Sequence, residues 1–303
     1  MRAETDDLAS GTTNAGARDA FVAGYRAWRD GDLQGAGTEL KRAIALDPSY
    51  AAAHLWLALL NTADDLLASR KDFQKASTGL DTLSAPNQTL LAAFAPLIQQ
   101  EPPDRAACIA KLEGAARSAN TSYLWAWVGL ARFDAEGPSP RALADMDRAL
   151  AIDPSFTILL HTKGQGLAYL GRFDEALSVL DRCLALSPLS SACYDDRRIV
   201  HTPRGDCAAI EADARRQQAA APDATEPYLM LAGVALWRDD PVETVIGLET
   251  QCVDRLDEHD RPLYRLWVRF TELLLRGQLD DASRRRDVEA REELRRCPIA
   301  RAT

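Results

Sequence analysis

The spacing of three prolines constrains the fold of this chain more than any other feature of its sequence. Pro188 follows Pro154 by 34 residues, and Pro222 follows Pro188 by another 34. A similar phrase precedes two of them, Ala-Leu-Ala-Ile-Asp-Pro at 149–154 and Cys-Leu-Ala-Leu-Ser-Pro at 183–188. Because proline cannot continue a helix, each phrase indicates a helix end. A fixed period of this length predicts an internally repeated structure.

Residues 157–188 show what one repeat contains. Two segments carry apolar residues at helical spacing, and the turn Gly171-Arg172-Phe173-Asp174 separates them. Gly164 and Ala176 stand near the middle of the two segments, where small side chains allow two helices to approach closely. Each repeat is therefore expected to be an antiparallel pair of helices.

The repeat resembles the tetratricopeptide repeat, a helix–turn–helix unit of about 34 residues that ends in proline. Signature positions of that family are occupied by Gly164, Tyr169, Ala176, Leu180 and Pro188. The small and apolar residues recur at the same offsets before two other prolines, as Ala36, Leu40 and Ala43 before Pro48 and as Ala142, Met146 and Ala149 before Pro154. The resemblance implies an all-α fold, a right-handed superhelical solenoid of antiparallel helix pairs with about seven to eight repeats.

Two regions depart from the repeat. Residues 1–16 are polar and without period, which predicts a disordered lead or linker, so the solenoid is assigned to 17–303. Its end, 284–296, is strongly charged, as a capping helix requires. In the sixth repeat Arg198 stands where a small residue is usual, and we expect it to be partly buried in a structural ion pair with Asp195 or with Asp213.

Charge and hydropathy exclude several functions. The chain has 303 residues, a net charge of −9 and a pI near 5.1, which provides no electrostatic basis for nucleic-acid binding. It contains no apolar run long enough to span a bilayer, so we expect no membrane insertion. The acidic N-terminus is unlike a signal peptide. A cytoplasmic location is expected, and the alternative is the extracytoplasmic part of a receptor-type kinase.

No motif for catalysis, cofactor binding or metal binding occurs, so we expect neither an enzyme nor a cofactor. The six cysteines include no Cys-x-x-Cys pair, and no metal site is expected. We expect buried free thiols, because cysteine is among the most buried residue types. The alternative is a disulfide between Cys183 and Cys193, which flank the turn at Pro188.

The family resemblance also implies a binding surface, the concave groove lined by the first helix of each repeat. Carried onto this sequence, the partner-binding positions are Arg18, Phe21, Tyr25, Trp28, Trp127, His161, Gln165, Asp195 and Ile199. The aromatic residues at its N-terminal end suit an extended or helical segment with apolar anchors. The alternative is that Phe21 and Tyr25 only pack against the lead segment.

These features favour a non-enzymatic scaffold that binds a segment of another protein, or a peptide, in its concave groove. Residues 90–222 also resemble tetratricopeptide regions appended to bacterial serine/threonine kinases, which implies a signalling or regulatory assembly. The competing hypothesis is a helical small-molecule sensor, or an enzyme-associated regulatory domain, with a pocket near Asp195–His201. A deep apolar cavity with converging polar groups would favour the sensor, and an open groove would favour the scaffold.

Overall fold

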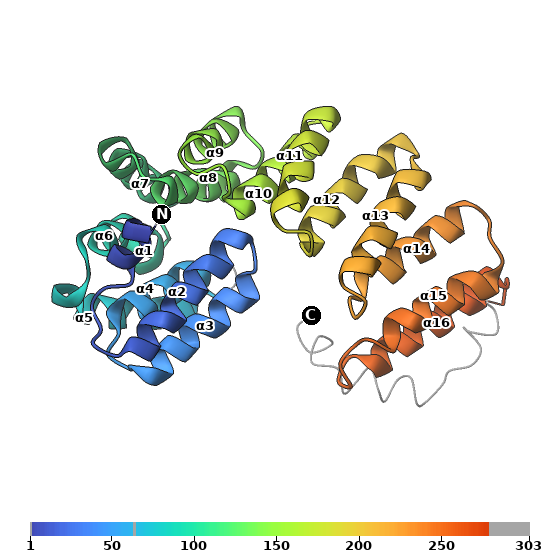
Figure 1. The fold of residues 1–303 in the computed structure, drawn as a ribbon, viewed down its shortest axis with the longest axis horizontal. Coiled ribbons are helices and arrows are strands. Elements are labelled where there is room, and N and C mark those ends of the chain that lie inside the picture. The colour runs from blue at the N-terminus through green and yellow to red at the C-terminus, as the bar shows by residue number, and fades with distance from the viewer. Residues whose placement is uncertain (1, 63–64, 279–303) are drawn as a thin grey trace. The chain divides into compact units, whose positions relative to one another are not determined.

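The computed structural model describes residues 2–62 and 65–278, and every regular element in them is helical (Figure 1). The prediction of an all-α fold is confirmed for this part of the chain. Fourteen of the helices follow one another as seven pairs, each joined by a short connection. The pairs are α2 (Ala15–Asp30) with α3 (Leu33–Leu46), α4 (Ala51–Leu60) with α5 (Leu66–Thr78), α6 (Ala85–Gln99) with α7 (Arg105–Ala119), α8 (Ser122–Glu136) with α9 (Pro140–Ile152), α10 (Thr157–Tyr169) with α11 (Phe173–Leu186), α12 (Ser191–His201) with α13 (Cys207–Ala220), and α14 (Glu226–Trp237) with α15 (Val242–Val253).

The remaining elements lie outside these pairs. Helix α1 (Arg2–Leu8) precedes them, α16 (Arg261–Leu275) follows them, and two short 3₁₀ helices (Leu80–Thr82 and Thr202–Arg204) lie in connections. The helices fall into two compact units, Met1–Ser187 with α1 to α11 and Pro188–Thr303 with α12 to α16. The continuous solenoid over 17–303 stays a prediction, and the charged capping segment 284–296 lies outside the described residues.

In three helix pairs of the first unit, a glycine in one helix faces a large apolar side chain in the other. A Cβ atom on Gly164 would lie 2.5 Å from Cδ2 of Leu180, closer than any side-chain contact allows. The same arrangement, with distances of 3.0 Å and 2.8 Å, joins Gly24 to Leu40 and Gly129 to Met146. The absent side chain therefore lets each pair of helix axes approach closely. These pairs are of the tetratricopeptide type that the sequence predicts.

The lead segment differs from the expected disorder. Leu8 is fully buried, and its carbonyl accepts a hydrogen bond from Nδ2 of Asn87 at 2.8 Å. The carbonyl of Ala9 accepts the hydroxyl proton of Tyr50 at 2.6 Å. The described part of residues 1–16 is ordered because buried side chains of later helices have their hydrogen-bond partners in it.

We predict that Gly164→Ala lowers the free energy of unfolding relative to Gly114→Ala. Both glycines lie inside helices, so the gain in helix propensity cancels between the variants. A Cβ on Gly114 would meet nothing within 4 Å, whereas one on Gly164 overlaps Leu180. Overpacking of this kind costs about 1–3 kcal/mol. Urea unfolding of the two variants measures the difference, and equal midpoints would contradict the close approach of α10 and α11.

Candidate functional site

The aromatic residues predicted to line an open groove form the interior of the first unit. The ring of Trp28 stacks on that of Trp127, with centroids 4.9 Å apart, and meets Trp56 edge-on at 5.1 Å. Only 1% of Trp28 and 7% of Trp127 is exposed, and Phe21 and Tyr25 are buried as well. At these four positions, therefore, no open groove exists. Phe21 and Tyr25 pack against the ring of Trp56, and the alternative that they only pack against the lead segment stays a prediction.

The first repeat contacts the fourth repeat and the connection to the fifth around these rings. Arg29 at the end of α2 forms an ion pair with Asp153, and its guanidinium carbon lies 5.1 Å from the ring centroid of Phe156. Nη2 of Arg29 also donates a hydrogen bond of 3.2 Å to Oγ of Ser155. The inner helices close on one another because each aromatic ring between them removes a large apolar area from water.

Three other predicted groove residues of the first unit lie outside this aromatic interior. Arg18 is exposed, and its guanidinium lies 3.4 Å from the carbonyl of Thr12. His161 and Gln165 are half-buried in α10. No described cavity gathers these three side chains, so their part in binding stays a prediction.

The first unit holds one candidate cavity, of about 280 Å³, beside α6, α7 and α8. Trp127 borders it, and its indole N–H has no acceptor. Most of its lining is apolar, and the whole set is Thr62, Phe94, Leu97, Arg105, Cys108, Ile109, Trp127, Leu130, Ala131 and Asp134. Because Trp127 belongs mainly to the interior, we take the larger cavity of the second unit as the candidate site.

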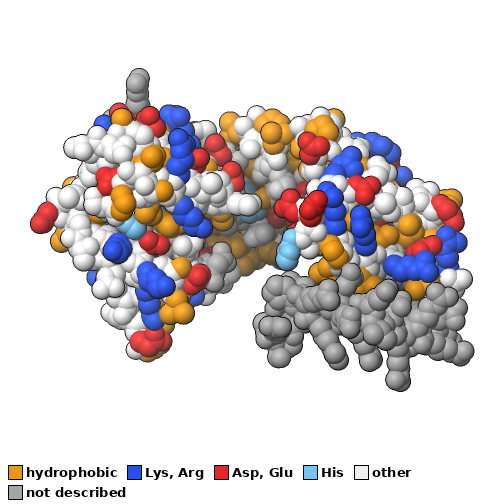
Figure 2. All heavy atoms as spheres, turned by 90° about the horizontal axis from the view of Figure 1, so that it is seen from below, with side chains coloured by type: hydrophobic (Ala, Val, Ile, Leu, Met, Phe, Trp, Pro, Cys, Tyr) orange, Lys and Arg blue, Asp and Glu red, His pale blue; other side chains and the backbone are white. Residues whose placement is uncertain are grey.

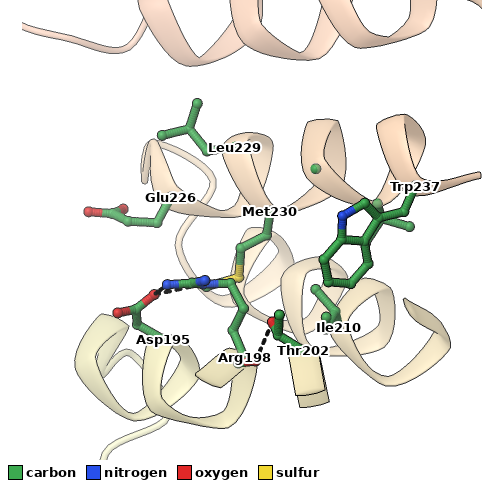
Figure 3. Close-up of a pocket in the computed structure, with 10 residues that line it drawn as sticks. Asp195, Arg198, Thr202, Ile210, Glu226, Leu229, Met230 and Trp237 are labelled. Carbon is green, nitrogen blue, oxygen red and sulfur yellow. Dashed lines mark hydrogen bonds and ion pairs between the residues drawn. The ribbon is translucent and has the colours of Figure 1, made fainter. Parts of the chain in front are cut away.

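That larger cavity, called here the α12–α14 cavity, has a volume of about 370 Å³ (Figure 3). Helix α12 supplies Asp195 and Arg198, and α14 supplies most of the apolar side chains. Its lining consists of Asp195, Arg198, Thr202, Ile210, Glu226, Leu229, Met230, Gly233, Val234 and Trp237. It lies on the first helices of two successive repeats, where the sequence predicts binding.

The Asp195–Arg198 ion pair lies in this cavity. Nε and Nη2 of Arg198 donate to Oδ1 of Asp195 at 2.9 Å and 2.6 Å. Arg198 is partly buried and paired with Asp195, in keeping with the expectation, although 40% of its side chain remains exposed. The more deeply buried arginine is Arg197, whose Nε donates to Oδ2 of Asp213 at 2.7 Å. Arg198 remains partly in solvent because its side chain extends into the cavity and not into the α12–α13 contact.

The position of Arg198 in the repeat sets it apart from the fifth repeat. Arg198 follows Gly164 by one repeat length of 34 residues, and Ala214 follows Leu180 by the same length. The sixth repeat therefore has no glycine–leucine contact at this place, and Ala214 is fully buried. The Arg198 side chain lines the cavity and supplies a charged group to it.

The prediction located one side of this site and missed the other. Asp195 borders the cavity, whereas Ile199 is half-buried in α12 and does not. The missed residues are on α14, where 43% of Leu229 and 54% of Trp237 is exposed. A signal was present, because α14 is apolar around most of its circumference, more than its packing covers.

His201 marks a buried polar cluster next to the cavity. Its Nδ1 lies 3.8 Å from Asp206 and its Nε2 3.8 Å from Asp213, distances too long for hydrogen bonds. Burial of the ring, with the nearby Arg197 guanidinium, lowers the pKa of His201 below its usual value. His201 itself does not line the cavity, although Thr202, the next residue in the chain, does.

The cysteines divide into two groups. Cys108, Cys207 and Cys252 are free, while Cys183 and Cys193 are disulfide-bonded. The expectation of free thiols is therefore wrong for the last two, and their pairing with one another stays a prediction. Among the residues that the structure describes, no group of three or more His, Cys, Asp or Glu side chains could hold a metal ion.

Charge and hydropathy of the surface add two observations. Acidic and basic side chains are intermixed on the face shown in Figure 2, where they do not gather into one basic surface. None of the helices within 2–62 and 65–278 is both long enough and apolar enough to cross a membrane.

Comparison with known proteins finds similar solved structures only. No protein-family model matches the chain, and no curated protein matches it. A tetratricopeptide repeat protein from Parabacteroides merdae ATCC 43184 is 14% identical with a TM-score of 0.47, over 84% of this chain and 98% of that one. Yeast Tom70 is 14% identical with a TM-score of 0.44, over 90% and 70%. PilW, a type IV pilus biogenesis factor, is 16% identical with a TM-score of 0.43, over 79% and 93%.

All three TM-scores are below 0.5 and all three identities are low, so the assignment of the fold rests on the helix pairs themselves. Their repeat length, the glycine contacts and the succession of pairs define a tetratricopeptide-type helical-repeat protein. The similarity to regions appended to kinases stays a prediction.

We predict that Trp28→Ala destabilises the protein strongly and that Trp237→Ala does not. Removal of a buried tryptophan costs about 3–5 kcal/mol, whereas a change at an exposed position stays within about 0.5 kcal/mol. The same substitution at two sites of opposite burial provides its own control. Thermal unfolding followed by circular dichroism measures both, and similar losses would contradict the buried aromatic interior.

The His201 environment predicts a loss of stability in mild acid. A lowered pKa in the folded state means that protonation favours the unfolded chain, so stability falls as pH drops below the ordinary histidine pKa of 6.5. The charged groups nearest the ring are Arg197, Arg204, Asp206 and Asp213. In His201→Gln, urea midpoints between pH 7.5 and 5 should decline less steeply than in the wild type. Parallel declines would show that other groups cause the pH dependence.

Proposed function

We propose that this protein is a non-enzymatic scaffold that binds a segment of another protein at the α12–α14 cavity. The observation that carries the proposal is the position of the cavity, which is lined by the first helices of two successive repeats. The cavity is large enough for one or two side chains of a partner. The rest of the segment would lie on the exposed surface around it.

The exposed apolar side chains of α14 support this proposal. Trp237 and Leu229 stand beside the cavity with about half of their surfaces in contact with solvent. Large apolar groups in a concave site are typical of contact with a partner, because their burial on binding is favourable. The bacterial signalling context rests only on the resemblance of 90–222 to kinase-appended repeats, and we keep it as part of the proposal.

A second candidate function is the binding of a small molecule. The volume of about 370 Å³ falls in the range of small-molecule sites, and an ion pair lies beside apolar walls. This observation favours the sensor hypothesis at the Asp195 end of the predicted pocket. It does not extend the pocket to His201.

We predict that Trp237→Ala weakens the binding of partner peptides by about thirty-fold, as expected for a buried interface tryptophan worth about 2 kcal/mol. Trp267→Ala is the matched control, because Trp267 is equally exposed but lies on α16, away from the cavity. Peptides selected from a displayed random library on the full-length wild-type protein serve as probes, and fluorescence anisotropy gives their affinities.

Equal affinity for wild type and Trp237→Ala would remove this cavity as the peptide site. A screen in which no peptide binds, but a small molecule raises the unfolding temperature of the wild type and not of Trp237→Ala, would favour the sensor instead.

A further inference from the structure

We propose that the segment bound at the α12–α14 cavity presents a lysine or arginine beside an apolar anchor. The inference rests on the proposed function and specifies the chemistry of the partner. It follows from the way in which charged and apolar side chains are separated within the cavity. Figure 3 shows Asp195 and Glu226 at one end, with Trp237 and Ile210 toward the other.

The polar end carries an excess of negative charge. Its charged groups are the carboxylates of Asp195 and Glu226 and the guanidinium of Arg198. Two carboxylates against one guanidinium leave a net charge of −1 where a partner would dock. An acidic side chain placed here would meet two like charges, whereas a basic one would meet two opposite charges.

Asp195 retains the capacity to bind a second cation. Both hydrogen bonds from Arg198 end on the same oxygen, Oδ1, which leaves Oδ2 of Asp195 for another donor. The side chain is about half exposed, so a partner can reach it. A carboxylate can accept bonds from two basic groups at once because its two oxygens offer several lone pairs. A partner cation therefore need not displace Arg198.

Glu226 adds the second attractive group from the opposite helix. It stands in the first turn of α14, is exposed, and takes part in no ion pair among the residues that the structure describes. A carboxylate in a first turn is also favourable toward the helix dipole. Glu226 is therefore favourably placed at the start of α14 and keeps its negative charge, which stays available to a partner.

The apolar end fixes where the anchor must lie relative to the basic group. Met230, Val234 and Trp237 succeed one another along one face of α14, and Ile210 of α13 lies opposite Trp237 in Figure 3. Because Glu226 begins the same helix that Trp237 ends, the two ends of the cavity are separated along α14. A partner must therefore place its basic and apolar side chains on one side of an extended strand or a helical turn.

Charge at this site selects the partner more than it strengthens binding. Exposed ion pairs contribute little free energy and are screened by salt, whereas complementary charge excludes wrong partners. Affinity is expected to come from the contact with Trp237. The preference for a basic residue is expected to come from Asp195 and Glu226.

The test is a peptide selection on the full chain with matched charge variants. Random displayed peptides are selected on the wild type, on Asp195→Asn/Glu226→Gln, and on Asp195→Asn alone. We expect wild-type peptides to be enriched in Lys or Arg within a few residues of Trp, Phe or Leu. Their affinity for the double variant should fall by about ten-fold at low salt and less at high salt.

The double variant provides a sign change that a merely structural role would not produce. With both carboxylates neutralised, the Arg198 guanidinium is the remaining charge of the polar end, so selection should shift from basic toward acidic residues. The single variant leaves a net charge of zero there, so the basic preference should weaken without reversing. A further variant, Asp195→Asn/Arg198→Gln, should show neither preference beyond the contribution of Glu226. Because these three side chains are at least partly exposed, the variants should unfold at nearly the wild-type temperature, which circular dichroism checks.

The outcomes separate this inference from the function on which it rests. Peptides that need Trp237 but show no enrichment in Lys or Arg, or the same enrichment in the double variant, would overturn the inference and leave the scaffold function intact. Selection of no peptide that depends on Trp237 would overturn the proposed function and the inference with it.

Discussion

The close approach of paired helices, made possible by a residue without a side chain, is the constraint on which the rest of this structure depends. A glycine facing Leu or Met joins α2 to α3, α8 to α9 and α10 to α11, and each contact leaves no room for a Cβ atom. Because the pairs are this tight, the apolar faces left over on the first helices must be covered by neighbouring pairs. Stacking follows from the packing inside each pair.

The two units differ in how far the side chains of their first helices are buried. In the first, Trp28, Trp56 and Trp127 meet one another, and an ion pair joins Arg29 of α2 to Asp153 at the end of α9. The aromatic side chains of these helices are therefore buried inside the first unit. In the second unit, α12 carries charged groups and α14 keeps part of its apolar surface in solvent, so the inner surface offers a cavity.

The sequence alone was sufficient for the helix pairs and insufficient for the state of the groove. Proline spacing and small residues at fixed offsets report contacts within a repeat, and these are local. Phe21 and Tyr25 pack against Trp56 of the next repeat, Trp28 packs against Trp127 far along the chain, and Arg29 pairs with Asp153, 124 residues away. Periodicity does not encode these contacts between repeats. Aromatic residues at successive predicted groove positions were nevertheless a usable sign that these positions are buried. For the sixth repeat, the sequence revealed the unusual Arg198 but not which of two adjacent arginines would be more deeply buried, because Arg197 and Arg198 differ only in helical phase.

Arg198 shows how a repeat can acquire a polar group on its first helix without altering its length. It stands where the fifth repeat has Gly164, and its side chain lines the cavity. One position of the repeat can thereby change from a packing contact into a recognition element. Modular proteins of this kind can diversify their ligands one hairpin at a time, with the neighbouring hairpins left untouched.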